Sequence, residues 1–156
     1  MRVFGGYFLT NTTKNNLFNY GISRVSNYAF SYGLLGQSAT SGLFAQQLII
    51  AEGGFKSYLG TTANKWITSV NVDSHVWRWF NMYADAGVYK NKNKSAEFIW
   101  DSGIKVKVIP DFLEVYFPVQ SSLGFEPSFK DYGKRIRFTL VLNFNAITSY
   151  FRRGWF

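Results

Sequence analysis

The stretch that decides the fold is Lys134-Arg135-Ile136-Arg137-Phe138-Thr139-Leu140-Val141-Leu142-Asn143-Phe144. Its even positions from 136 onward are all apolar, whereas its odd positions are mostly polar. Successive side chains of a β-strand point to opposite faces, so this pattern predicts a strand with one apolar face. Such a face must meet either a second apolar layer of protein or lipid. Segments with the helical periodicity that could supply a protein layer are hard to find in this chain.

The composition favours lipid as the environment of that face. Aromatic residues make up 20% of the chain, and the mean hydropathy is −0.09. No run approaches the ~18 apolar residues of a membrane-spanning helix. Outer-membrane barrels combine alternating strands, aromatic girdles and turn-rich connections. The 156 residues fit one domain. We therefore predict an all-β fold, either an antiparallel transmembrane β-barrel of about eight strands or the C-terminal strands of a larger barrel.

Alternation also predicts the other strands and the turns between them. The expected strands are residues 2–10, 28–35, 46–58 with a bend at Gly53-Gly54, 66–73, 77–90, 98–108, 113–119 and 134–144. Asp73-Ser74-His75 and Pro110-Asp111 are expected to form turns, 91–95 a polar loop and 121–133 a long connection. Short turns of bacterial barrels face the periplasm, which places the C-terminus there. Residues 1–146 are assigned to the barrel strands and 147–156 to an interfacial tail.

Aligning the strands places a set of charged residues on their inward faces. Because a narrow lumen holds little water, these charges are expected to pair with one another. Their functional interpretation is a selective pore or a ligand site. Their structural interpretation, which a barrel of this size favours, is a salt-bridge network that fills a non-conducting barrel. The set comprises Asp73, Asp85, Asp101, Lys105, Lys107, Glu114, Arg135 and Arg137.

Aromatic and basic residues predict how the protein meets the membrane. Rings at the headgroup level and guanidinium groups beside phosphates are typical of interfacial belts. The expected anchors are Trp66, Trp77, Trp100, Tyr150, Arg152, Arg153, Trp155 and Phe156. A strand that ends in Phe is also typical of the insertion signal of bacterial barrels. We assign that signal to Leu140, Leu142 and Phe144.

Several chemistries find no support in the sequence. The chain has no cysteine and a single histidine, His75, so it lacks the ligands of a zinc site. It contains no His-Glu-x-x-His, Gly-x-Ser-x-Gly or phosphate-loop motif. The net charge of +8 is spread along the chain, which disfavours nucleic acid as a partner. We therefore assign no catalytic residue, metal or cofactor.

Several runs of residues resemble a known family. They are residues 46–56, 101–104, 114–119, 123–126, 134–138 and 151–156. These runs resemble the C-terminal portion of large Bacteroidota proteins described as M1-family (gluzincin) metallopeptidases. The resemblance implies an outer-membrane region that follows a peptidase domain, whose zinc-binding helix is absent from these 156 residues. The terminal strands are also similar to those of Omp85-type assembly and secretion barrels.

The expected function follows from these patterns. We expect an outer-membrane barrel, or part of one, that anchors its protein or an envelope complex in the outer membrane of a Gram-negative bacterium. Its partners would be membrane lipid and either an envelope complex or a covalently linked upstream domain. The first residues lack a secretory signal, which indicates a mature chain or a piece of a longer one. The alternatives are a pore or assembly barrel with a charged lumen, an enzyme that depends on a partner chain or upstream domain, and a soluble β-sandwich.

Overall fold

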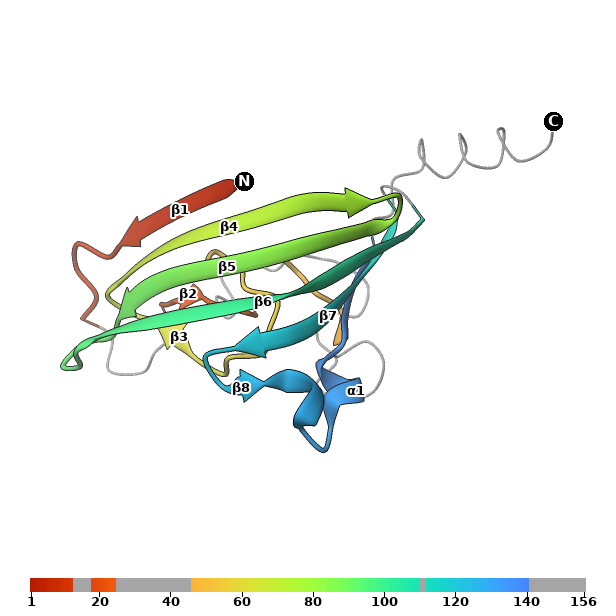
Figure 1. Cartoon of the computed structure of the whole chain (residues 1–156). Coiled ribbons are helices and arrows are strands. Elements are labelled where there is room, and N and C mark those ends of the chain that lie inside the picture. Colours follow the sequence, from red (N-terminus) through yellow and green to blue (C-terminus); the bar gives the residue numbers. More distant parts are fainter. Residues whose placement is uncertain (13–17, 25–45, 110–111, 141–156) are drawn as a thin grey trace.

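The main feature of the computed structural model is one large antiparallel sheet. Residues 1–12, 18–24, 46–109 and 112–140 are described. The sheet has seven strands in the order β1-β4-β5-β6-β7-β8, with β9 paired to β7 beside β8. It curls into a half-barrel (Figure 1). The predicted all-β, antiparallel class is therefore confirmed.

The long strands that follow one another along the chain are also hydrogen-bonded neighbours in the sheet. Its strands are β1 (Arg2–Tyr7), β4 (Trp66–Trp77), β5 (Phe80–Lys90), β6 (Ala96–Ile109), β7 (Leu113–Ser121), β8 (Gly124–Phe125) and β9 (Arg137–Leu140). A separate two-stranded sheet pairs β2 (Tyr20–Gly21) with β3 (Thr62–Ala63). A 3-10 helix, Glu126–Ser128, and a four-residue helix, α1 (Tyr132–Arg135), follow β8. No helix within the described ranges has the length and apolar character needed to span a membrane.

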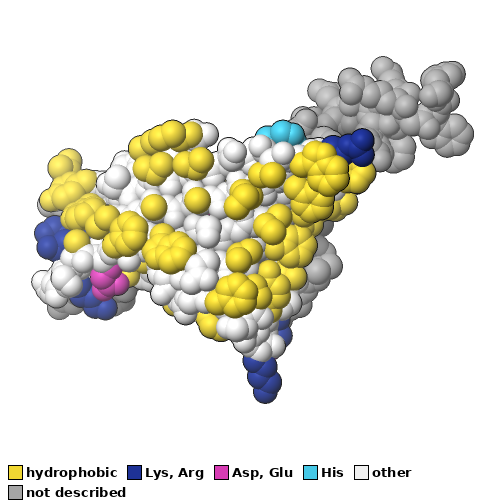
Figure 2. All heavy atoms as spheres, viewed as in Figure 1, with side chains coloured by type: hydrophobic (Ala, Val, Ile, Leu, Met, Phe, Trp, Pro, Cys, Tyr) yellow, Lys and Arg dark blue, Asp and Glu magenta, His cyan; other side chains and the backbone are white. Residues whose placement is uncertain are grey.

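The two faces of the sheet differ in the way that the alternation predicts. In β5 every second residue from Asn81 to Tyr89 is buried, and most residues between them are exposed. The exposed set is apolar: Phe80 and Met82 are 45% and 58% exposed. Figure 2 shows apolar side chains spread over the outward face, with the Lys and Arg side chains of this view at its margins. The convex face is therefore apolar and uncovered, whereas the concave face is buried.

Residues 46–59, here called the inner segment, lie against the concave face (Figure 1). The prediction of a long strand at 46–58 is therefore wrong: the only β-bridge that the structure describes there is Gln47 with Phe138. Gly54 has a φ of 75°, and a Cβ atom on it would lie 2.4 Å from Arg2 Nη1. This left-handed residue takes the backbone out of strand geometry and brings it close to the sheet.

A small apolar core joins the inner segment to the end of the sheet near residues 91–95. It is formed by Ile22, Phe55, Ala63, Ile67, Tyr89 and Ile99. Phe55 is 1% exposed and fits over Gly87, where an added Cβ atom would come within 3.1 Å of its ring. The glycine in β5 therefore makes room for the aromatic ring of the inner segment.

Three further local predictions are wrong. The chain does not turn at Asp73-Ser74-His75, because β4 continues to Trp77 and the turn lies at Arg78-Trp79. The strand predicted from Lys134 begins only at Arg137, because residues 132–135 form α1. The polar loop at 91–95 is found where predicted. The stretch predicted as a long connection, 121–133, instead holds a tight turn into β8, which pairs with β7, then the 3-10 helix and the start of α1. Some predictions lie outside the described residues: strand 28–35, the turn at Pro110-Asp111, and the whole of 141–156 with Leu142, Phe144, Tyr150, Arg152, Arg153, Trp155 and Phe156.

Candidate functional site

A row of polar side chains crosses the concave face from β1 to β7. Its members are cross-strand partners in register: Arg2 with Asn71, Asn71 with Asp85, Asp85 with Asp101, and Asp101 with Ser121. We call these five residues the polar belt. Partners in register project to the same face of a sheet, which is why five separate strands deliver one continuous row.

Hydrogen bonds connect the first half of the polar belt. Arg2 Nη1 donates to Asn71 Oδ1 at 3.2 Å. Asn71 Nδ2 donates to Asp85 Oδ1 at 3.0 Å. Asp85 and Asp101 are only 2% and 1% exposed. Two carboxylates at such depth need partners, since burying an uncompensated charge is costly.

Lys56 of the inner segment supplies the charge that faces this carboxylate pair. Its Nζ lies 2.7 Å from Asp85 Oδ1, and the two side chains are 11% and 0% exposed. The backbone N–H groups of Lys56 and Ser57 donate to Asp101 Oδ2 at 2.9 Å and 2.5 Å. Each carboxylate of the pair is therefore bonded to the same dipeptide. This contact locks the inner segment onto the sheet.

Other contacts hold the inner segment along its length. Arg2 Nη2 donates to the carbonyl of Glu52 at 2.8 Å, and Asn71 Nδ2 donates to that of Gly53 at 3.1 Å. Near the start of the segment, the Leu48 N–H donates to the carbonyl of Phe138 in β9 at 2.6 Å. The inner segment is thus fastened to β1, β4 and β9 as well as to the carboxylate pair.

A second charge cluster lies beyond the polar belt, toward the turn at Arg78-Trp79. Lys105 is 7% exposed and forms ion pairs with Asp73 and with Glu114, the latter at 3.5 Å. Asn81 Nδ2 donates to Asp73 Oδ1 at 2.8 Å. Lys107 is the register partner of Glu114. Three of the predicted inward charges therefore pair with one another here, and Lys107 lies beside them in the sheet.

Arg135 and Arg137, near the start of the 134–144 stretch, lie on different elements. Arg137 in β9 is 3% exposed, and its Nε and Nη2 donate to the carbonyls of Gln46 and Gln47, each at 3.3 Å. Arg135 lies on α1 instead of an inward strand position, which corrects its predicted place. Its Nη1 lies 2.8 Å from Glu126 Oε2.

Glu126, in the connection after β7, contacts Ser121, the last residue of the polar belt. It is fully buried, and Ser121 Oγ donates to its Oε1 at 2.6 Å. Burial, followed by the nearby negative charge of Glu126, raises the pKa of the Tyr132 hydroxyl above its ordinary value. Arg135 and Glu126 thus fasten α1 to the end of β7.

The sequence did not identify several residues that build this interior. Arg2, Asn71, Ser121 and Glu126 were not assigned to it, and Lys56 was hidden in a segment predicted as a strand. Asn71 occupies the polar phase of its strand with Ser69 and Asp73, so alternation could have found it. Arg2 shares its face with Phe4 and Gly6, so its strand gave no such signal. Lys56 carried no such signal, because its contact partner lies 29 residues further along the chain.

The three expected interface anchors within the described residues, Trp66, Trp77 and Trp100, lie on the outward side. Trp77 is 64% exposed, and Trp79, in the turn that follows it, is 61% exposed. Trp66 and Trp100 are half-buried and share the outward phase of their strands. Trp66 and Trp77 stand at opposite ends of β4, so described aromatic rings occur near both ends of the sheet.

The described residues hold no group of three or more His, Cys, Asp or Glu side chains that could bind a metal ion. His75 lies with its Nδ1 3.4 Å from Asn81 Oδ1, at the edge of the second charge cluster. Comparisons with known proteins found no matching family, no matching curated protein and no matching solved structure. The function of the chain is therefore inferred from its geometry.

Proposed function

We propose that this chain is an outer-membrane β-barrel, or the membrane part of one, that acts as an anchor for its protein or for an envelope complex. One observation carries the proposal: the convex face is apolar and exposed, while the concave face carries the buried charges beside a small apolar core and is filled by the inner segment. A soluble sheet of this size would hide the apolar face, because burial of apolar surface is the main force that stabilises soluble folds. Barrel strands in lipid show this inverted arrangement.

Strand length supports the same proposal. β5 has 11 residues and β4 has 12. At about 3.3 Å per residue, 11 residues extend about 36 Å, and a tilt of about 45° reduces the span to about 26 Å. The apolar band of an outer-membrane barrel is about 25 Å tall. The long strands therefore have the length that the bilayer requires.

The filled interior favours anchoring over conduction. The inner segment occupies the concave side and bonds to the carboxylate pair, and Lys105 pairs with Asp73 and Glu114. A selective pore would need these charges to line an open water path. Their mutual pairing supports a structural barrel whose interior is closed to solutes.

The test is the mass and gel mobility of the protein from native outer membrane, unheated and heated. A band near 17.9 kDa that shifts on heating would support a barrel that closes from this chain alone. A heat-shifted band of much larger mass would support the membrane part of a longer protein. In that case a zinc-binding helix encoded upstream would link the chain to a gluzincin peptidase. Recovery in the soluble fraction, with no shift on heating, would refute the proposal.

A further inference from the structure

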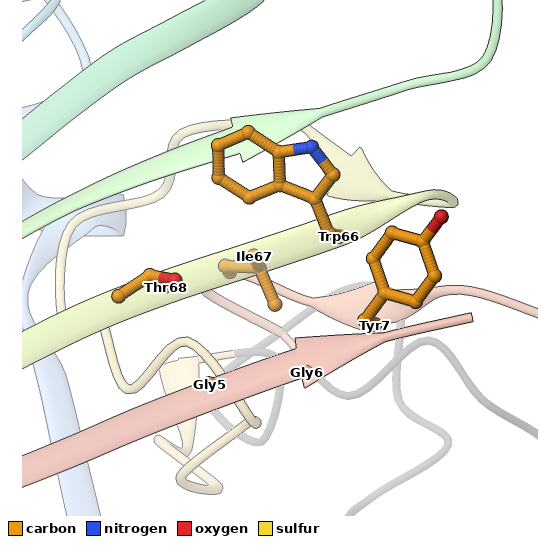
Figure 3. Close-up of a pocket in the computed structure, with 6 residues that line it drawn as sticks. All are labelled: Gly5, Gly6, Tyr7, Trp66, Ile67 and Thr68. Atoms are coloured by element: carbon orange, nitrogen blue, oxygen red, sulfur yellow. The ribbon is translucent and has the colours of Figure 1, made fainter. Parts of the chain in front are cut away.

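A shallow groove on the outward face lies over the paired strands β1 and β4 near one end of the sheet. It has a volume of about 460 Å³ and is lined by Gly5, Gly6, Tyr7, Trp66, Ile67 and Thr68. Figure 3 shows the rings of Tyr7 and Trp66 on neighbouring strands, whereas Gly5 and Gly6 carry no side chain. A Cβ atom on Gly5 would meet nothing within 4 Å. The missing side chain therefore leaves space that opens toward the surroundings of the sheet.

A basic notch of about 220 Å³ lies directly beyond this groove, and Tyr7 lines both. Its other lining residues include Leu9, Lys65 and Lys92, and none of its lining residues is acidic. Neither lysine forms an ion pair within the described part of the chain. The nearby carboxylate of Glu97 accepts a hydrogen bond from the Tyr89 hydroxyl. The notch thus has two lysines and no acidic residue in its lining, beside an apolar groove.

The backbone around the notch is held by asparagine side chains. Asn64 Oδ1 accepts the N–H of Lys92 at 2.7 Å, and Asn91 Oδ1 accepts the N–H of Asn64 at 2.8 Å. Asn11 Nδ2 donates to the carbonyl of Asn64 at 3.0 Å. These bonds tie the 91–95 loop to the segments before β4 and after β1. Hydrogen bonds therefore hold the backbone from which the two lysine side chains extend.

We propose that the groove and the notch together bind one phosphate-bearing membrane lipid. Lys65 and Lys92 would hold the phosphate by charge-assisted hydrogen bonds, while one acyl chain lies over Gly5 beside the rings of Tyr7 and Trp66. The pairing of β1 with β4 runs from Arg2–Asn71 to Tyr7–Trp66, so closure of a barrel at the other edge of β1 leaves the groove in place. The inference rests on the proposed membrane function, because the occupant is a lipid.

Native mass spectrometry of the purified, delipidated protein in detergent would test this site. The probes are phosphatidylglycerol, lipid A, diacylglycerol as a chain without phosphate, and inorganic phosphate as a headgroup without a chain. We expect one equivalent of phosphatidylglycerol or lipid A to bind, and the better of the two identifies the lipid class. Binding of diacylglycerol with equal affinity, or of inorganic phosphate alone, would overturn the proposal.

Two variants separate the two halves of the site. Lys65→Gln with Lys92→Gln removes the cationic partners, and Gly5→Leu fills the groove without a clash at its Cβ atom. Each change should lower lipid affinity by about tenfold or more. The matched controls are Lys130→Gln with Lys134→Gln, which removes the same charge near α1, and Gly133→Leu, another glycine with open space around its Cβ atom. The controls should keep the affinity of the parent protein.

The outcomes distinguish this site from the proposed function. If both test variants reach the outer membrane, shift on heating and still bind lipid as the parent does, the lipid site is refuted and the barrel proposal stands. If the parent protein is soluble and shows no heat-dependent shift, the proposed function fails first.

Discussion

Lys56 stands at the point where the inner segment and the sheet depend on each other. Asp85 and Asp101 are buried side by side, and the Lys56 side chain pairs with the first while its backbone N–H bonds to the second. Removing one partner of a buried ion pair leaves the other charge uncompensated. This lowers the stability of the protein more than replacing both partners by apolar residues would. The stability of the interior should therefore depend on this one ammonium group.

We predict that Lys56→Met destabilises the protein by about 3–5 kcal/mol, since a buried carboxylate loses its cation. Denaturant unfolding in detergent micelles would measure the change in the free energy of unfolding. Lys134→Met is the matched control. Its ion pair with Asp131 joins side chains that are 81% and 66% exposed, so a change under about 1 kcal/mol is expected. Equal effects of the two substitutions would show that the Lys56 contact is dispensable.

At the scale of the element, β5 shows how strictly the two faces are separated. Its buried positions carry Asn81, Tyr83, Asp85, Gly87 and Tyr89, whereas its other positions are mostly apolar and exposed. Ala84 lies near the middle of the exposed set, between Val72 of β4 and Ser102 of β6. In the proposed barrel this residue faces the centre of the bilayer.

Ala84→Arg should therefore impair membrane assembly, because an Arg on the lipid face near the midplane costs about 2–4 kcal/mol. The fraction of protein that becomes heat-modifiable after refolding into lipid vesicles would report the effect. Ser95→Arg, in the exposed loop after β5, adds the same charge away from the apolar band and should assemble normally. Normal assembly of both variants would argue against a lipid-facing β5.

At the scale of the whole molecule, the inner segment should remain inside the sheet in the native membrane. Ser57 is fully buried, whereas Leu9 is 90% exposed. Since the chain has no cysteine, a single cysteine substitution provides the only thiol that a reagent can label. We predict that Ser57→Cys resists a membrane-impermeant thiol reagent until the protein is heated, while Leu9→Cys reacts at once. Rapid labelling of both would indicate an open water path and favour a pore.

Period-two alternation was enough to predict the sheet and the facing of its long strands. It placed Asp85, Asp101 and Lys105 on the concave side, where the structure has them. This succeeds because facing in a strand is a local property that depends only on the parity of the position. The prediction failed at Arg135 because the strand was extended back to Lys134, whereas the apolar alternation begins only at Ile136, after the end of α1.

The course of residues 46–59 could not be read from alternation, because it depends on contacts with distant strands. Leu48, Gly53 and Lys56 bond to residues 90, 18 and 29 positions away. The burial of Glu126 likewise depends on Ser121 and Arg135, which meet only once β7 and α1 are in place. Local sequence thus dictates an antiparallel sheet with one apolar and one polar face. The filling of its concave side arises from tertiary packing, since buried charges are stable only where distant partners come together.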